Sequence, residues 1–173
     1  MNSPLNYKQL IDHAPIILRM MDASGRCVYV NKCWYDYTGQ ADDGGLNRGW
    51  LEAVHPDDRM AIEKTFGPYT LRQAANHIYR LRSSHGEYRW MLDTTKPLYD
   101  GEDLLGFIGS ITDIHDWKLA EDTAKDNELK CKESEYRFRQ LVDHLPVGLY
   151  VTDDKGHLTL VNPADANDMG RRL

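Results

Sequence analysis

The chain has 173 residues, of which 41% are hydrophobic and 28% charged, as is usual for a globular protein of one domain or slightly more. Its formal net charge of −6 argues against nucleic acid as a partner, because no broad basic face can be assembled. The sequence has neither an apolar run long enough to cross a bilayer nor a signal-peptide core at its start, which predicts a cytoplasmic location.

The first half of the chain predicts one hairpin followed by a series of short helices. Apolar runs indicate two strands, and Gly25 suits the turn between them because glycine readily adopts a positive φ. Pro56 and the two acids that follow it are typical of a helix N-terminus. In chain order we expect a helix at 7–13, strands at 16–22 and 26–30, and helices at 31–37, 50–54, 55–66 and 69–75.

The second half predicts three strands and a long helix. The strands are expected at 76–82, 87–98 and 105–112, and the helix at 114–144. Five antiparallel strands with helices on one face make an α+β domain. The outer face of this sheet carries Ile108 and Ile114, so we expect either the helix at 7–13 or a second copy of the chain to cover it.

The last strand passes into the long helix without a tight turn. Asp113 stands where a helix N-cap would, and Asp116 three residues later is a weak capping-box partner. Because no flexible turn separates the two elements, a shift of the strand would be passed on to the helix. We therefore predict that the junction relays a conformational signal. The candidate relay residues are Thr112, Asp113, Ile114, Asp116 and Trp117.

The chain contains an internal repeat. When the sequence is shifted by 131 residues, eleven of the 33 positions in 7–39 are identical to their counterparts in 138–170. The matched residues include Asn31, which can cap the following helix, and His13, which we expect to bond the backbone. The chain thus holds one module and the beginning of a second, which we expect to be either truncated or completed by another chain.

Residues 114–144 contain no glycine or proline and predict one continuous helix. A heptad pattern can be laid on this helix, although two of its seam positions are polar. One interpretation is a solvated linker. We favour a two-stranded coiled coil, because a long helix with little apolar face needs a partner to persist in water. The seam positions are Trp117, Ala124, Cys131 and Phe138 in one row, and Ala120, Asn127, Ser134 and Leu141 in the other.

Aromatic side chains are spread over the predicted helices and strands of the first module. They form either a hydrophobic core or the wall of a small-ligand pocket between the helices and the sheet. The candidate pocket residues are Trp34, Tyr37, Trp50, Phe66, His77, Tyr79, Trp90 and Ser110.

We find no motif for catalysis or metal binding. The sequence lacks G-x-S-x-G, P-loop, H-E-x-x-H and C-x-x-C strings. Cys27, Cys33 and Cys131 are odd in number and not spaced for zinc, which favours free thiols in a reducing compartment. His55 precedes Pro-Asp-Asp, a pattern that we interpret as a helix start rather than a metal site.

Several strings, taken in this order, resemble the PAS domain family. They are V-N at 30–31, T-G at 38–39, H-P-D-D-R at 55–59, Y-R-L-R at 79–82, G-E-Y-R-W at 86–90 and G-S-I-T-D-I at 109–114. The resemblance covers 7–121 in full and 136–172 in part. With the repeat and the linker, it implies a PAS-like domain at 1–115, a helical linker at 116–144 and the N-terminal part of a second PAS-like domain at 145–173.

The resemblance implies a non-catalytic sensory module. Such a module binds a small ligand or a partner, biases the linker helix and acts on an effector, such as a histidine kinase or diguanylate cyclase domain in a longer chain. The expected partner is a second copy, bound through the linker helix and the outer sheet face. The cofactor is left open, and the absence of one is favoured over haem or flavin. The alternative is a haem- or flavin-bearing sensor with His77 as haem ligand; around Cys33 the N-C-R-F-L-Q string of light-sensing flavin domains is absent.

Overall fold

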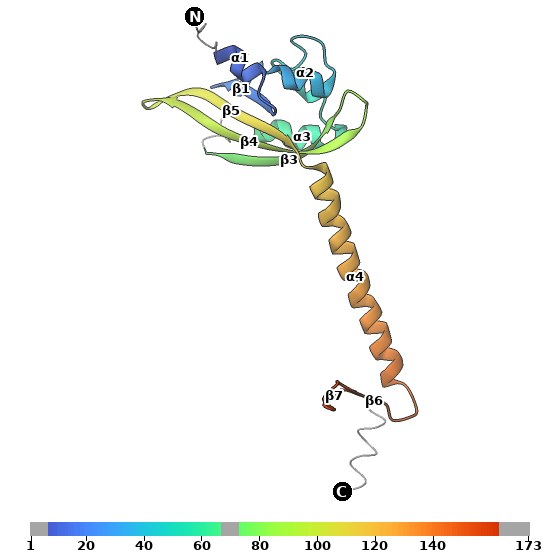
Figure 1. Cartoon of the computed structure of the whole chain (residues 1–173). Helices are drawn as coiled ribbons and strands as arrows, with labels where there is room; N and C mark the ends of the chain where they lie inside the picture. Colours follow the sequence, from blue (N-terminus) through green and yellow to red (C-terminus); the bar gives the residue numbers. More distant parts are fainter. Residues whose placement is uncertain (1–6, 67–72, 163–173) are drawn as a thin grey trace, which may run out of the picture. The chain divides into compact units, whose positions relative to one another are not determined.

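The computed structural model describes residues 7–66 and 73–162 (Figure 1). The chain divides into two compact units, Met1–Lys118 and Leu119–Leu173, and each is considered by itself.

The first unit is built on a five-stranded antiparallel sheet in the order β2-β1-β5-β4-β3, whose long strands lie side by side in Figure 1. The strands are β1 (Ile17–Asp22), β2 (Cys27–Val30), β3 (Ala75–Arg82), β4 (Tyr88–Asp100) and β5 (Asp103–Asp113). The last strand, β5, is central and pairs with β1 on one side and β4 on the other. The sheet therefore joins the two ends of the unit.

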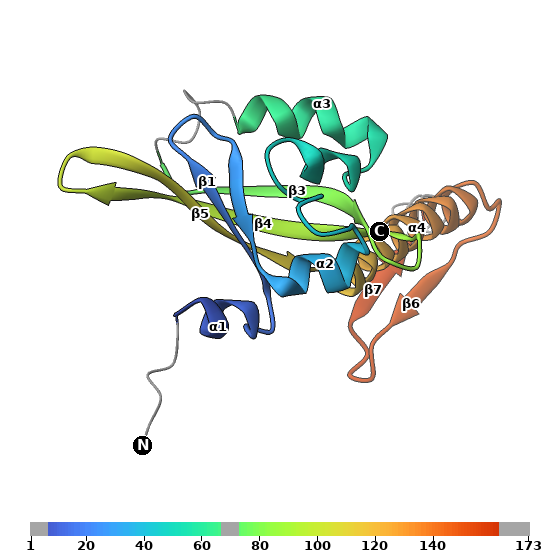
Figure 2. The same cartoon turned by 90° about the horizontal axis from the view of Figure 1, so that it is seen from above.

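Short helices cover one face of this sheet. They are α2 (Lys32–Thr38), the 3-10 helix η1 (Gly49–Glu52) and α3 (Pro56–Thr65), whereas α1 (Tyr7–Asp12) adds no residue to the core beneath them. Figure 2 shows α3 beside β3, where Asp58 of α3 accepts a hydrogen bond from the backbone N–H of Arg80 at 2.9 Å. The buried side chains of α2, η1 and α3 form one hydrophobic cluster with the inward-facing side chains of the strands.

The opposite face of the sheet keeps apolar side chains at its surface. Because side chains alternate along a strand, the residues between the buried ones point outward. Ile78 of β3 and Ile108 of β5 are 48% and 43% exposed. Helix α1 thus leaves these positions exposed, and the expected cover by a second copy stays a prediction.

The predicted fold class is confirmed, and the element boundaries differ from the predicted ones by at most two residues, with one exception. Of the helical turn predicted at 69–75, residues 69–72 lie outside the described residues. The remainder is not helical, because Ala75 pairs with Thr95 in the ladder between β3 and β4. Sheet pairing takes precedence over local helical tendency there.

Asn31 does not cap the helix that follows it, contrary to the sequence-based expectation. Its side chain is buried and holds together the segments before it instead. The side-chain oxygen accepts a hydrogen bond from the backbone N–H of Leu18 at 3.0 Å. The side-chain NH₂ donates to the carbonyls of Ile11 and Ile16, both at 2.9 Å. One amide therefore fixes the end of α1 and the start of β1.

The second unit contains most of α4 (His115–Asp143) and the hairpin of β6 (Tyr150–Thr152) and β7 (Leu158–Val161). It repeats the amide contacts of the first copy. Asn162 accepts from the backbone N–H of Leu149 at 2.8 Å. Its NH₂ group donates to the carbonyls of Val142 and Val147 at 3.1 and 2.9 Å. These residues stand 131 positions after those of the first copy, so the repeat extends from sequence to geometry.

The two histidines of the repeat bond the backbone, as predicted. His13 Nδ1 lies 2.8 Å from the carbonyl oxygen of Gln9, and His144 Nδ1 lies 2.7 Å from that of Gln140. Both contacts close a helix end before a proline.

Candidate functional site

The junction between β5 and α4 is held by one carboxylate. Asp113 Oδ1 accepts a hydrogen bond from the backbone N–H of His115, the first residue of α4, at 2.9 Å. Asp113 Oδ2 accepts from Arg89 Nε at 2.6 Å and from the Tyr37 hydroxyl at 3.1 Å. A single side chain thus ties α2, β4 and the first turn of α4 to the end of β5.

Arg89 extends this network to the second acid of the predicted relay. Its Nη2 donates to Asp116 Oδ1 at 3.2 Å, so Asp116 pairs with a strand residue rather than closing a capping box. Only Ile114 separates β5 from α4, and its backbone N–H donates to the carbonyl of Trp90 at 2.9 Å. The hydrogen bond that Arg89 donates to Asp113 raises the pKa of Arg89, which therefore stays charged. The junction has no free loop.

The electrostatics of Asp113 predict an acid-sensitive junction. Burial alone would raise its pKa, but the hydrogen bonds from Arg89, His115 and Tyr37 outweigh burial and hold the pKa below its usual value of 3.8. A carboxyl whose pKa is lower in the folded state adds stability at pH values above 3.8 and loses it as the pH falls through the folded pKa.

We therefore expect the free energy of unfolding to decrease as the pH falls below about 4, and to decrease less steeply in Asp113→Asn. Chemical denaturation at a series of pH values measures both slopes. Asp58, whose pKa is lowered by its hydrogen bond with Arg80, contributes to the slope in both proteins. Equal slopes would contradict the role of Asp113.

A small cavity of about 140 Å³ adjoins the junction. It lies between α2, the starts of β1 and β4, and the end of β5. It is lined by Pro15, Ile16, Ile17, Cys33, Tyr37, Met91, Ile111, Thr112 and Asp113. Two predicted relay residues and one predicted pocket residue thus share one cavity.

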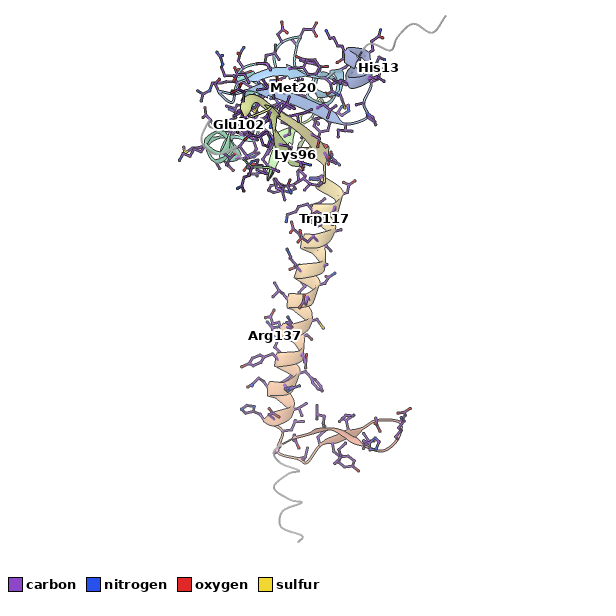
Figure 3. The ribbon with its side chains drawn as sticks, turned by 90° about the vertical axis from the view of Figure 1, so that its left-hand side faces the viewer. His13, Met20, Lys96, Glu102, Trp117 and Arg137 are labelled. Atoms are coloured by element: carbon purple, nitrogen blue, oxygen red, sulfur yellow. The ribbon has the colours of Figure 1, made fainter. Side chains whose placement is uncertain are left out.

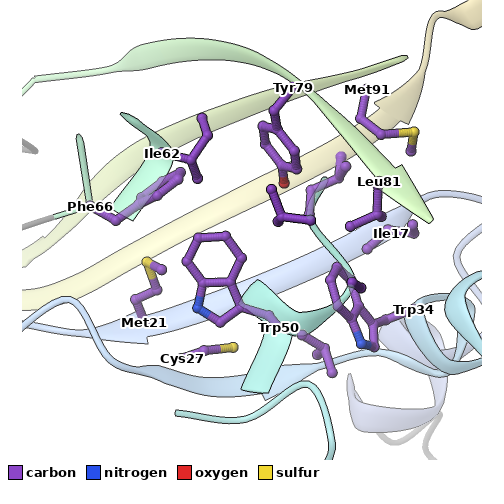
Figure 4. Close-up of a cluster of buried hydrophobic side chains, with 14 of the residues drawn as sticks. Ile17, Met21, Cys27, Trp34, Trp50, Ile62, Phe66, Tyr79, Leu81 and Met91 are labelled. Carbon is purple, nitrogen blue, oxygen red and sulfur yellow. The ribbon is translucent and has the colours of Figure 1, made fainter. Parts of the chain in front are cut away.

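Four of the predicted pocket residues come together in the interior, between the helices and the sheet. Figure 4 shows Trp34, Trp50, Phe66 and Tyr79 among the buried side chains that point toward one another. Trp50 and Phe66 make an edge-to-face contact with ring centroids 5.4 Å apart. Tyr37 lies at the margin of this cluster.

Trp90 and Ser110 are not part of the interior, contrary to the predicted pocket. Each lies between inward-facing neighbours on its strand, so both side chains point to the outer face. Trp90 there stacks under the guanidinium of Arg80, 5.3 Å from the ring centroid. Of the relay residues, Trp117 projects from α4 and is 60% exposed (Figure 3).

The interior also holds a buried ion pair that sequence reasoning missed. Arg19 Nη2 lies 2.8 Å from Asp93 Oδ2, and the two side chains are 1% and 0% exposed. The same carboxylate accepts from the Tyr79 hydroxyl at 3.0 Å and from the Thr95 hydroxyl at 2.9 Å. The guanidinium lies over the rings of Trp50 and Phe66, 5.1 and 4.3 Å from their centroids.

The sequence did carry a signal that Arg19 is buried. Side chains alternate along the strand I-I-L-R-M-M-D, and this alternation puts Arg19 on the same side as Ile17 and Met21.

A larger cavity of about 700 Å³ lies between α1, β2 and α2. None of the predicted pocket residues lines it. Its lining is largely polar and comprises Lys8, Asp12, His13, Val28, Tyr29, Val30, Lys32, Tyr35, Asp36, Asp42, Asp43 and Leu46. In the described part of the chain, no group of three or more His, Cys, Asp or Glu side chains is arranged to hold a metal ion. None of the helices described there is long and apolar enough to span a membrane.

Comparison with known proteins places both copies in one family. Residues 27–111 match the family described as PAS fold, and residues 136–164 match the family described as PAS domain. The uncharacterized protein y4lL of Sinorhizobium fredii is 34% identical over 122 residues, which cover 69% of this chain and 15% of y4lL. The peroxide stress-activated histidine kinase mak1 of Schizosaccharomyces pombe is 26% identical over 138 residues, which cover 73% of this chain and 8% of mak1.

Solved structures share the fold. An RNA-binding light-oxygen-voltage receptor superposes with a TM-score of 0.57 at 18% identity, over 79% of this chain and 42% of that one. The PAS domain of BvgS from Bordetella pertussis superposes with a TM-score of 0.52 at 24% identity, over 73% of this chain and 95% of that one. With its repeated geometry and both family matches, the chain belongs to the PAS domain family and holds one full PAS domain followed by the start of a second.

Proposed function

We propose that the chain is a sensory relay module. A small ligand or a partner binds the first PAS domain, and α4 carries the resulting conformational change to an effector. The observation that supports the relay best is the junction at Asp113, where a single residue separates the central strand from α4. The hydrogen bonds of this carboxylate to Arg89 and His115 join both elements mechanically.

The central strand is well placed to collect a signal. Phe107 and Ile111 of β5 belong to the buried cluster between the helices and the sheet. A ligand that repacks this cluster acts on β5 directly, and β5 ends at Asp113. For a signal to pass, the ligand has to bind one arrangement of the junction more tightly than another.

The nature of the effector is a further part of the proposal. The relative from Schizosaccharomyces pombe is by name a histidine kinase, and this chain spans 8% of its length. A histidine kinase domain elsewhere in a longer protein is therefore a suitable receiver of the signal. The chain itself carries no motif for catalysis.

Hydrogen exchange tests the relay directly. A compound that raises the melting temperature of the purified chain in a small-molecule screen should change amide protection in the first turns of α4 as well as in the core. Protection that changes in the core alone would contradict the relay. A visible absorption spectrum of the same preparation comes first, because a band at about 400–450 nm would indicate bound haem or flavin and favour a cofactor-bearing sensor instead.

We further propose that α4 pairs with a second copy of itself. Five ion pairs between residues four apart support the helix, each with the acid on the N-terminal side. Apolar side chains nevertheless remain exposed along the predicted seam, with Trp117 at 60% and Phe138 at 55%. A coiled coil would bury them.

Phe138→Glu should weaken self-association at least about tenfold, because a charge at the seam has to be desolvated when the helices pair. Tyr136→Glu is the matched control, since Tyr136 stands two positions away on the opposite side of the heptad and is 65% exposed. Sedimentation equilibrium of the chain measures both dissociation constants. Equal effects of the two substitutions would place the interface elsewhere.

A further inference from the structure

Four buried side-chain atoms in the described part of the first PAS domain have no hydrogen-bond partner. Glu63 Oε1 forms an ion pair with Arg48 instead, and Ser83 Oγ belongs to the turn after β3. The other two, Nη1 of Arg19 and Nε2 of His77, belong to strands of the sheet. Unsatisfied buried polar groups cost free energy, and each one in a folded protein therefore calls for an explanation. Neither atom is used by the junction at Asp113.

Both atoms flank the same carboxylate. His77 of β3 stands directly opposite Asp93 of β4 in the antiparallel ladder. Arg19 reaches Asp93 from β1 with its Nη2 atom. The ring of Phe66 connects the two groups, since the guanidinium lies 4.3 Å and the imidazole ring 5.0 Å from its centroid. The unpartnered atoms thus belong to one cluster.

The cluster has unused hydrogen-bond donors, whereas the carboxylate of Asp93 is already occupied. Asp93 already accepts from three groups, namely Arg19, Tyr79 and Thr95. Arg19 satisfies only one of its two terminal nitrogens, although its side chain is 1% exposed. A group that completes the cluster has to bring oxygen acceptors.

The backbone leaves room for these polar groups. Gly109 of β5 lies under the cluster, and a Cβ atom at this position would approach Thr95 Oγ1 to 2.8 Å and Asp93 Oδ1 to 3.4 Å. Any larger residue would displace the polar side chains. The central strand is therefore shaped to accommodate a polar interior.

A cavity adjoins the aromatic side of the cluster, although neither Arg19 nor His77 lines it. Trp50 and Phe66, the two rings that flank the Arg19 guanidinium, also line a cavity of about 200 Å³. Its volume corresponds to roughly six water molecules at about 30 Å³ each, which suits a molecule of few heavy atoms. The other lining residues are Ser24, Gly25, Arg26, Asn47, Arg48, Leu51 and Glu63.

We propose that Arg19 and His77 form the recognition site for a small carboxylate, which passes the Trp50 and Phe66 rings to reach them. A carboxylate has two oxygens and can accept one hydrogen bond from each donor, whereas an arginine and a histidine are both suited to charge-assisted bonds with it. This inference names the ligand class for the sensing function proposed above and rests on that function.

Calorimetric titration of the full chain with acetate, propionate and pyruvate tests the proposal, with acetamide as the uncharged control of similar size. At least one carboxylate should bind, and acetamide should not. Arg19→Lys keeps the positive charge beside Asp93 but removes the second terminal nitrogen, and His77→Phe removes Nε2. Each should weaken binding at least about tenfold, the expected effect of losing one charge-assisted hydrogen bond.

Matched substitutions at exposed sites control for general effects. Arg82→Lys and His85→Phe make the same changes at exposed positions of β3 and its following turn, and both should bind as the unchanged chain does. Circular dichroism checks that each variant is folded. If Arg19→Lys is unfolded, His77→Phe decides the question alone.

Three results would overturn the proposal. They are no carboxylate binding at up to about 10 mM, equal binding by His77→Phe, and a crystal structure from carboxylate-containing solution with water alone on Arg19 Nη1. Binding of acetamide in place of carboxylates would overturn the ligand class and leave the sensing function intact. Carboxylate binding without any change in α4 protection would support the site and contradict the relay.

Discussion

Asp93→Leu should lower the free energy of unfolding by about 3–5 kcal/mol, because it leaves the Arg19 guanidinium buried without a counter-charge. The arginine is 1% exposed, so water does not replace the lost counter-charge in the folded protein. The hydroxyls of Tyr79 and Thr95 lose their acceptor at the same time. Urea denaturation followed by tryptophan fluorescence measures the change, since Trp50 lies against the guanidinium.

The double variant Arg19→Met/Asp93→Leu separates the cost of an unpaired charge from the net contribution of the ion pair. Apolar replacement of a whole buried pair is often neutral or stabilising, so the double variant should recover most of the loss. Asp100→Leu, at an exposed position of the same strand, is the matched control and should change stability by less than about 0.5 kcal/mol. A cost below about 1 kcal/mol for Asp93→Leu would show that the pair is not sealed from water.

Asp113→Ala should detach the start of α4 from the sheet and lower the free energy of unfolding by about 2–3 kcal/mol. The substitution removes the acceptor of the hydrogen bonds that Arg89, the Tyr37 hydroxyl and the backbone N–H of His115 donate. Hydrogen exchange should become faster in the first turn of α4, while the amides of β4 and β5 stay protected.

Asp116→Ala is the control for this experiment. Asp116 is exposed and shares Arg89 as partner through one bond of 3.2 Å, so its loss should cost less than about 0.5 kcal/mol. If Asp113→Ala unfolds the whole domain, the residue serves the fold rather than the coupling of strand and helix. If exchange in α4 is unchanged, the carboxylate does not anchor the helix.

Local patterns in the sequence were sufficient to predict most helices and strands and the continuous junction between β5 and α4. Alternation and turn residues define the strands, and the absence of glycine and proline from 114–144 defines α4. The contact of Asp113 with the backbone of His115 followed from its place between two continuous elements, whereas its bonds with Arg89 and Tyr37 did not. The comparison of the two copies also located Asn31 and Asn162, although their role is different from a helix cap.

Long-range contacts were beyond the reach of these patterns. Asn31 bonds to Ile11, twenty residues away, because a buried amide finds more partners there than at a helix end. The pair of Arg19 and Asp93 joins strands that are 74 positions apart in sequence and are not neighbours in the sheet. Residue type alone placed Trp90 in the pocket, although strand alternation points it outward.

The strand order has a consequence for synthesis of the protein. The ladder between β1 and β5 pairs Ile17 with Ile111, so the sheet cannot close until nearly the whole domain has left the ribosome. Until then, β1 and β4 each lack the central strand as a partner. The anchor for α4 forms in the same step, since Asp113 is the last residue of β5. In a nascent chain, the start of α4 is therefore held in place only after the first PAS domain has been completed.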